Sequence, residues 1–176
     1  MPEKQTIYLG SDPWAADLHK HIAELCRSLE HPTEEVNVAG AADRTAYQEI
    51  ARRVAVNVST HHGSFGIVLC GTGMGVSMVA NMFPGISCAL CENTFAAERS
   101  RVLNNANVLA MGEFVTTPYV AGEIVKAFLT TEFLDGIEPD LGEQIKGWHK
   151  AVNDMQARIT VPSWEEASAE GTAGNE

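Results

Sequence analysis

The sequence has little positive charge and no long apolar run, and both absences exclude classes of protein. Lys and Arg total 12 against 23 Asp and Glu, which gives a net charge of -11. A protein that binds nucleic acid or an anionic membrane surface needs clustered basic residues, so neither partner is expected. No stretch of about 18 consecutive apolar residues occurs, so no membrane span is expected.

Cysteines are few, and we expect all four to be reduced thiols. Cys88 and Cys91 form a C-x-x-C pair, but it lies in an apolar, strand-like run. Residues three apart in a strand point to opposite faces, which is poor geometry for a disulfide or a shared metal. The N-terminus also lacks the pattern of a secretion signal, so we predict a cytoplasmic protein.

The composition is that of one globular domain followed by a polar end. The chain has 176 residues, of which 45% are hydrophobic and 20% charged. A chain of this length buries about two-thirds of its unfolded surface and needs no disulfides. We predict one domain over residues 1–160. Residues 161–176 hold four glutamates and no base, which predicts an acidic, mobile tail.

Short apolar runs alternate with longer amphipathic segments along most of the chain. The predicted strands cover residues 6–10, 35–38, 65–70, 86–91 and 107–111. The predicted helices cover residues 17–29, 46–58, 76–81, 94–102 and 118–128. This alternation is typical of βαβ crossovers, so we predict an α/β fold with a five-stranded parallel sheet covered on both faces.

One more amphipathic helix is expected after the last strand. Its apolar residues are Leu141, Ile145, Trp148, Val152 and Met155. A helix added to a complete α/β layer is often a contact between subunits, and packing on its own domain is the alternative.

The densest chemical signal is the segment Leu69–Ser77, which reads LCGTGMGVS. A buried strand ends at Cys70, three alternating glycines follow, and a helix begins. Such a turn lets the backbone approach an anion closely and aims free N–H groups at it. We expect these groups to favour the thiolate of Cys70 and to make a proton-transfer site. A tight turn with an inert cysteine is the alternative.

Together with residues 80–81, 84–86, 97–99 and 104–112, this block resembles the ribose-5-phosphate isomerase B and galactose-6-phosphate isomerase family. The resemblance covers about residues 5–135. It implies a Rossmann-like three-layer α/β/α fold, aldose–ketose isomerisation of a sugar phosphate, and no metal or other cofactor. It also implies a homodimer, a homotetramer or a hetero-oligomer, with sites between subunits.

The resemblance also implies roles for individual residues. Cys70 is the expected base, acting through a cis-enediolate, and Thr72 is expected to help hold the developing charge. The other expected ligands and walls of the substrate site are Asp12, Tyr47, Gly71, Gly73, Gly75, Ser77 and Asn104. Trp14 is also expected to line the site, because it stands beside Asp12 and aromatic walls suit sugar faces.

Several positions depart from the family pattern. Leu103 stands where a ring-opening histidine is usual, Pro13 replaces a second histidine, and Phe114 replaces an arginine. Residues 136–140 hold no base where the family often has phosphate-binding arginines. These changes leave three interpretations: a short open-chain substrate such as a tetrose 4-phosphate, a subunit that needs a different partner subunit, or an unphosphorylated sugar.

A non-catalytic sugar-binding protein is a further alternative. The arginines that remain as candidate anion ligands are Arg44, Arg99 and Arg101.

Overall fold

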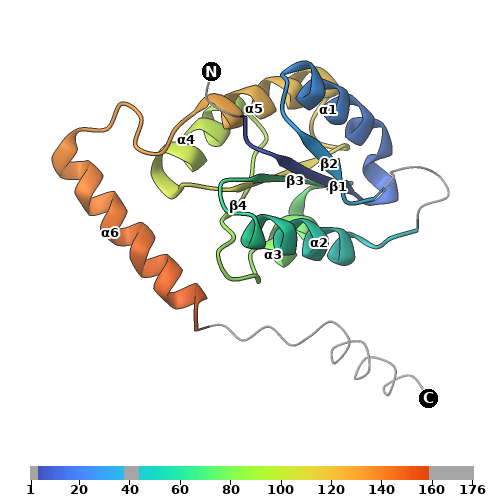
Figure 1. Cartoon of the computed structure of the whole chain (residues 1–176). Helices are drawn as coiled ribbons and strands as arrows, with labels where there is room; N and C mark the ends of the chain where they lie inside the picture. The colour runs from blue at the N-terminus through green and yellow to red at the C-terminus, as the bar shows by residue number, and fades with distance from the viewer. Residues whose placement is uncertain (1–3, 38–43, 159–176) are drawn as a thin grey trace, which may run out of the picture.

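A computed structural model describes residues 4–37 and 44–158, which form a parallel sheet between two helical layers (Figure 1). The sheet order is β2-β1-β3-β5-β4, and every neighbouring pair is parallel. The strands are β1 (Ile7–Ser11), β2 (Thr33–Glu35), β3 (Phe65–Cys70), β4 (Cys88–Leu90) and β5 (Val108–Gly112). The predicted five-stranded parallel sheet is confirmed. The predicted tail, residues 161–176, lies outside the described residues.

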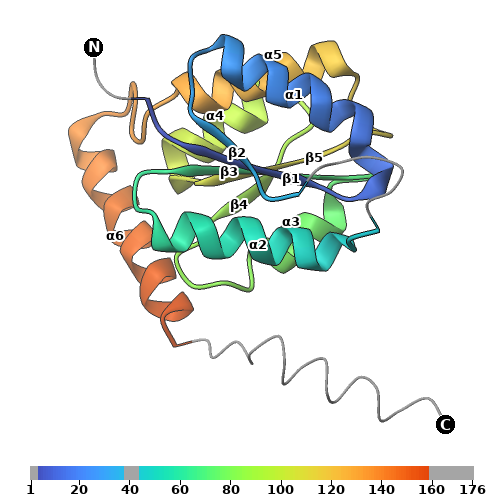
Figure 2. The same cartoon turned by 45° about the vertical axis from the view of Figure 1, so that its right-hand side comes forward.

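The helices cover both faces of this sheet (Figure 2). One layer contains α1 (Ala16–Ser28), α4 (Thr94–Asn104) and α5 (Pro118–Thr130), and the other contains α2 (Tyr47–Thr60) and α3 (Met74–Ala80). A short 3-10 turn, η1 (Pro13–Ala15), connects β1 to α1. The Rossmann-like three-layer arrangement implied by the resemblance is therefore present.

Alternation along the strands decides which layer each side chain meets. In β3, Ile67 and Leu69 pack with α1 and α5, whereas Val68 and Cys70 pack with α2 and α3. Successive strand residues point to opposite faces, and both faces of a parallel sheet are buried, which explains the continuous apolar run. Cys70 therefore ends its strand on the α2–α3 side.

The second strand lies earlier in the chain than predicted. It covers Thr33–Glu35 rather than residues 35–38, and Val38 lies outside the described residues. The Ile7 N–H donates to the Pro32 carbonyl, so pairing starts directly after the proline. At Asn37 the side chain, not the backbone, bonds to β1, and this ends the ladder.

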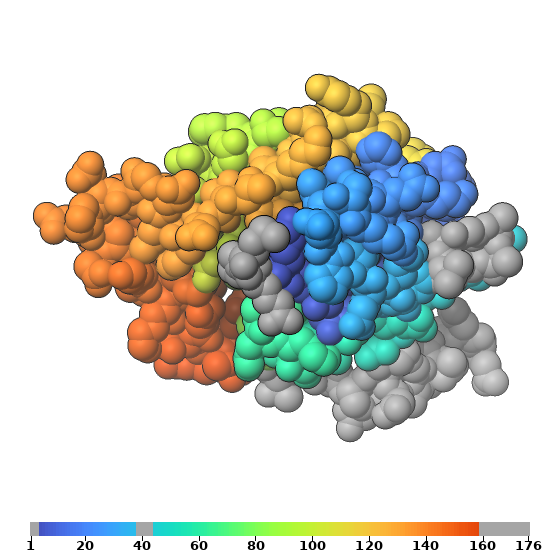
Figure 3. Space-filling model, turned by 45° about the horizontal axis from the view of Figure 1, so that its top comes forward, coloured from blue at the N-terminus to red at the C-terminus, as the bar shows by residue number. Residues whose placement is uncertain are grey.

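The predicted C-terminal helix is present as α6 (Pro139–Gln156) and lies beside α4. In Figure 3 it forms, with the preceding segment, a lobe on one side of the molecule. Ile145 is buried, but Trp148, Val152 and Met155 are exposed. A hollow of about 590 Å³ lies between α6 and the α4–β4 side of the body. None of the helices in the described residues is long and apolar enough to cross a membrane.

Candidate active site

Cys70 lies at the carboxyl end of β3, where the chain turns into α3. Its side chain is 6% exposed, and the Gly73 N–H donates to its Sγ at 3.1 Å. Gly73 has φ +75°, a conformation that favours glycine, and it is the cap of α3. A donor aimed at the sulfur bonds more strongly when the sulfur carries negative charge. The local sequence thus builds a turn that aims a backbone N–H at the Cys70 sulfur.

A hollow of about 390 Å³ opens beside this turn. Its lining is Asp12, Trp14, Tyr47, Cys70, Gly71, Thr72, Gly75 and Phe114. These residues come from the end of β3, from the segments that follow β1 and β3, including η1 and the start of α3, from the start of α2 and from the loop after β5. Ligands of parallel α/β sheets bind at this carboxyl edge. The sulfur is therefore not sealed in the core, and most of the predicted site residues lie together.

Aromatic side chains form the walls of the hollow, and glycines let them approach. A Cβ on Gly75 would lie 2.8 Å from the Tyr47 ring, and one on Gly71 would lie 2.7 Å from the Phe114 ring. Trp14 meets Phe114 edge to face, with 6.1 Å between ring centroids. Such flat apolar walls suit the faces of sugars.

Asp12 is the acidic group of the hollow, and it is 6% exposed. Its Oδ1 accepts a hydrogen bond from the Trp14 N–H at 2.9 Å, which caps η1. Burial, with a smaller contribution from the nearby Glu113 carboxylate, raises the pKa of Asp12 despite the hydrogen bond from Trp14. The carboxyl is thus held by the backbone at the edge of the site.

Three of the predicted site residues do not line the hollow. Gly73 contributes its amide to Cys70 from behind the turn. Ser77 is buried in α3, where its hydroxyl donates to the Met74 carbonyl. Asn104 ends α4, which runs back across the sheet, so it lies at the opposite edge and lines the hollow beside α6. Four strand steps of 3.3 Å put it on the order of 15 Å from Cys70.

Of the three candidate anion ligands, only Arg44 lies near this site. It lines a second hollow, of about 620 Å³, which shares Asp12, Trp14 and Tyr47 with the first. Arg101 is buried, and its guanidinium bonds to the Ala106 and Thr131 carbonyls. Its burial lowers its pKa. Arg99 lies over the Phe95 ring, 5.6 Å from its centroid.

Phe114 lines the hollow beside Cys70, and the sequence did not predict this. The sequence marked it only as the replacement of an arginine, but its ring lies over Gly71 and completes the wall with Trp14. A signal was available, because Phe114 follows the end of β5, and the ends of parallel strands meet at one edge.

Within residues 4–37 and 44–158, no three His, Cys, Asp or Glu side chains are placed to hold a metal ion together. All four cysteines are free, and burial raises the pKa values of Cys26, Cys88 and Cys91, that of Cys26 to about 12.

Comparison with known proteins places these features in a family. The family model described as Ribose/Galactose Isomerase matches residues 7–141. A D-erythrulose-4-phosphate isomerase from Pectobacterium atrosepticum is 34% identical over 131 residues, which make up 74% of this chain and 86% of that protein. A 4-deoxy-4-sulfo-D-erythrose isomerase from Clostridium sp. is 29% identical over 153 residues, 87% of this chain and 96% of that protein.

The architecture is shared as well. The solved structure of ribose-5-phosphate isomerase B from Clostridium thermocellum aligns with a TM-score of 0.79 at 30% identity. The alignment covers 89% of this chain and 100% of that one. The alignment therefore extends over most of this chain and all of that one.

Proposed function

The chain belongs to the ribose/galactose isomerase family and is a sugar-phosphate isomerase, and we propose that it interconverts the aldose and ketose forms of a four-carbon sugar phosphate. One observation carries the proposal. The Cys70 sulfur accepts the Gly73 amide beside a hollow that Asp12 and Thr72 also line. A base, hydrogen-bond donors and a hydroxyl ligand are what proton transfer next to a carbonyl requires.

In the proposed reaction, the Cys70 thiolate removes the proton from carbon 2 of the aldose. The C–H electron pair forms the C1–C2 double bond of a cis-enediolate, and the former carbonyl oxygen takes up the negative charge. The Thr72 hydroxyl and the amides of the glycine turn stabilise that oxygen. A proton then passes from the oxygen on carbon 2 to the oxygen on carbon 1. Cys70 returns its proton to carbon 1, which gives the ketose.

The preference for four carbons follows from ring chemistry. A tetrose 4-phosphate has no free hydroxyl that can close a ring, so it needs no ring-opening group. Leu103 replaces the histidine that the family resemblance assigns to that step, and none of the described residues lining the site hollow is a histidine. Relatives named as isomerases of four-carbon substrates support this choice.

The phosphate group of such a substrate needs a positively charged ligand, and we assign that role to the guanidinium of Arg44. It lies in the hollow adjoining the Cys70 site, behind the shared walls of Trp14 and Tyr47. Charge attraction between the Arg44 guanidinium and the phosphate would orient the chain of carbons toward Cys70.

A substrate panel tests the proposal. We expect kcat/KM for erythrulose 4-phosphate to exceed that for ribose 5-phosphate by about 100-fold or more, because a site shaped for the shorter chain does not open a ring. Turnover is followed by NMR in D2O, where isomerisation introduces deuterium at carbon 1 or carbon 2. Efficient turnover of ribose 5-phosphate would contradict the four-carbon assignment. If erythrulose without phosphate were turned over equally well, the substrate would be a free sugar and not a sugar phosphate. Binding without turnover of any sugar in the panel would indicate a sugar-binding protein.

We also propose that the working unit contains two chains, with Asn104 serving the site of the second one. Within one chain Asn104 lies at the sheet edge opposite Cys70, so it reaches a Cys70 site only across an interface. The exposed apolar side chains of α6, including Trp148 and Val152, supply surface for such a contact.

Mixing two inactive variants tests the shared site. Cys70→Ala and Asn104→Ala are each expected to be inactive alone, but co-expressed they should recover about a quarter of wild-type activity, because mixed dimers regain one complete site. Size-exclusion chromatography with light scattering checks the assembly. Failure to recover activity in confirmed mixed dimers would remove Asn104 from the site, and an active monomer would refute the two-chain unit. A partner subunit of different sequence would be indicated if the chain turned over sugar only with such a subunit added.

A further inference from the structure

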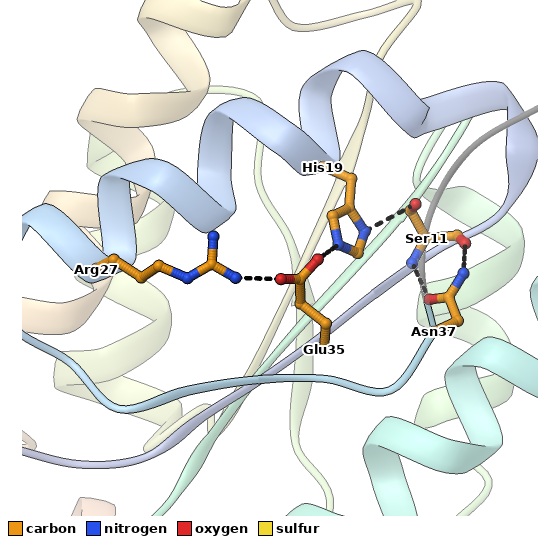
Figure 4. A network of polar contacts seen from close by, with 5 residues as sticks. All are labelled: Ser11, His19, Arg27, Glu35 and Asn37. Carbon is orange, nitrogen blue, oxygen red and sulfur yellow. Dashed lines mark hydrogen bonds and ion pairs between the residues drawn. The ribbon is translucent and has the colours of Figure 1, made fainter.

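A polar network with a buried centre joins Ser11, the residue before Asp12, to α1 and β2 (Figure 4). Its centre is His19 of α1, which is 1% exposed. The His19 Nδ1 lies 2.9 Å from the Ser11 Oγ, and the Nε2 lies 2.8 Å from a Glu35 carboxylate oxygen. The other Glu35 oxygen pairs with Arg27.

Asn37 holds the same serine from the opposite side. The Ser11 N–H donates to the Asn37 Oδ1 at 3.2 Å, and the Asn37 Nδ2 donates to the Ser11 carbonyl at 2.8 Å. Ser11 is 1% exposed and is the last residue of β1. Every polar group of Ser11 thus has a partner, and the next residue in the chain is Asp12.

The charges in this network are arranged to keep it fixed. Burial acts to raise the pKa of Glu35, but hydrogen bonds and charge attraction from His19 and Arg27 outweigh it and hold that pKa below its usual range. Glu35 is therefore ionised at neutral pH and accepts the Nε2 proton of His19. The other ring nitrogen, Nδ1, hydrogen-bonds with the Ser11 hydroxyl in either protonation state of the ring, because that hydroxyl can both donate and accept.

Stability alone does not account for these groups. The side chains of Arg27 and Glu35 are 52% and 29% exposed, and an ion pair that solvent reaches contributes only about 0–1 kcal/mol to stability. A hydrogen-bonded network does, however, restrict geometry more sharply than apolar packing does. The residue it restricts here adjoins a carboxyl that lines the active site.

We infer that His19 is a positioning residue: backed by Glu35 and assisted by Asn37, it fixes Ser11 and thereby aims the Asp12 carboxyl at the substrate. This inference rests on the proposed function for its effect on turnover. Misplacing a binding group by about 1 Å can cost as much as 100-fold in rate, so the network matters even though it touches no substrate.

Two substitutions of His19 separate its two contacts. The amide of His19→Asn reaches the position of Nδ1 and keeps the Ser11 contact, whereas that of His19→Gln reaches the position of Nε2 and keeps only the Glu35 contact. We expect kcat/KM to fall about tenfold in His19→Gln and in Ser11→Ala, mainly through KM, and to stay within about threefold of wild type in His19→Asn. His21→Gln, on the same helix, is the control and should change nothing. Equal losses in both His19 variants would overturn the inference.

A double-mutant cycle shows whether the effect passes through Asp12. Ser11→Ala should change kcat/KM less than about twofold when Asp12 is already Asn, because the group being aimed is gone. Multiplicative losses would indicate general destabilisation and contradict a positioning role.

Hydrogen exchange tests the network independently of the reaction. By mass spectrometry, the amides of residues 11–15 should exchange about tenfold faster in His19→Gln and Ser11→Ala than in wild type or His19→Asn, with residues 70–75 unchanged. If the wild type turned over no sugar, the proposed function would fail while this measurement still decided the structural claim. Equal exchange in all variants would refute it.

Discussion

Replacing Cys70 with alanine is expected to lower kcat/KM by about 1,000-fold or more while leaving the fold intact. A positioned general base contributes about 100- to 10,000-fold, and Cys70 supplies the sulfur among the described residues that line the hollow. The side chain lost is small and lies at the open end of β3, so the packing cost is minor. Circular dichroism and thermal unfolding check the fold, and deuterium incorporation from D2O checks proton transfer.

Cys91→Ala is the matched control for this experiment. Cys91 is 1% exposed, and its side chain packs in the core on the other face of the sheet from Cys70. Its removal should lower stability by about 1 kcal/mol and leave kcat/KM unchanged. Iodoacetamide at neutral pH should alkylate Cys70 selectively, because burial raises the pKa values of the other three cysteines, and substrate should slow that reaction. Full turnover by Cys70→Ala would remove Cys70 from the mechanism.

Gly73→Ala is expected to lower kcat/KM by about 100-fold, because it displaces the turn that bonds to the sulfur. A Cβ on Gly73 would lie 2.7 Å from the backbone carbon of Met111 and 3.0 Å from the Gly112 nitrogen. Backbone atoms of β5 cannot move aside as a flexible side chain can. The positive φ of Gly73 adds about 1–2 kcal/mol of strain for any residue with a Cβ.

Gly63→Ala separates the clash from the strain. Gly63 has φ +87°, but a Cβ there would meet no atom within 4 Å. In urea unfolding, the free energy of unfolding of Gly63→Ala should therefore fall only by the strain energy, and its kcat/KM should stay at the wild-type value. If Gly73→Ala behaved like Gly63→Ala in both measurements, contact of the turn with β5 would not matter for the reaction.

The local features of this site could be predicted from the sequence because they are encoded within a few consecutive residues. The apolar run of β3, the thiol at its end and the three glycines follow one another directly in the chain. Their order alone makes a strand, a turn and a helix start. For the same reason, the alternation of strand and helix patterns was enough to predict a parallel sheet.

The second strand shows where such reasoning loses accuracy. Residues 35–38 have the apolar content of a strand, but the paired residues are Thr33–Glu35. Pairing with β1 and the side-chain bonds of Asn37 to Ser11 decided the boundary, and neither is visible in the local pattern.

The sequence by itself determined the class of fold, and it was enough to propose the carboxyl edge as the place of the site and Cys70 as its base, because periodicity and turn chemistry are local. Only the tertiary structure brought Phe114 against Trp14, connected His19 to Ser11 and Glu35, and placed Asn104 at the far edge. The first two are contacts between segments separated along the chain. They depend on strand order, register and helix packing, which no short stretch of sequence encodes.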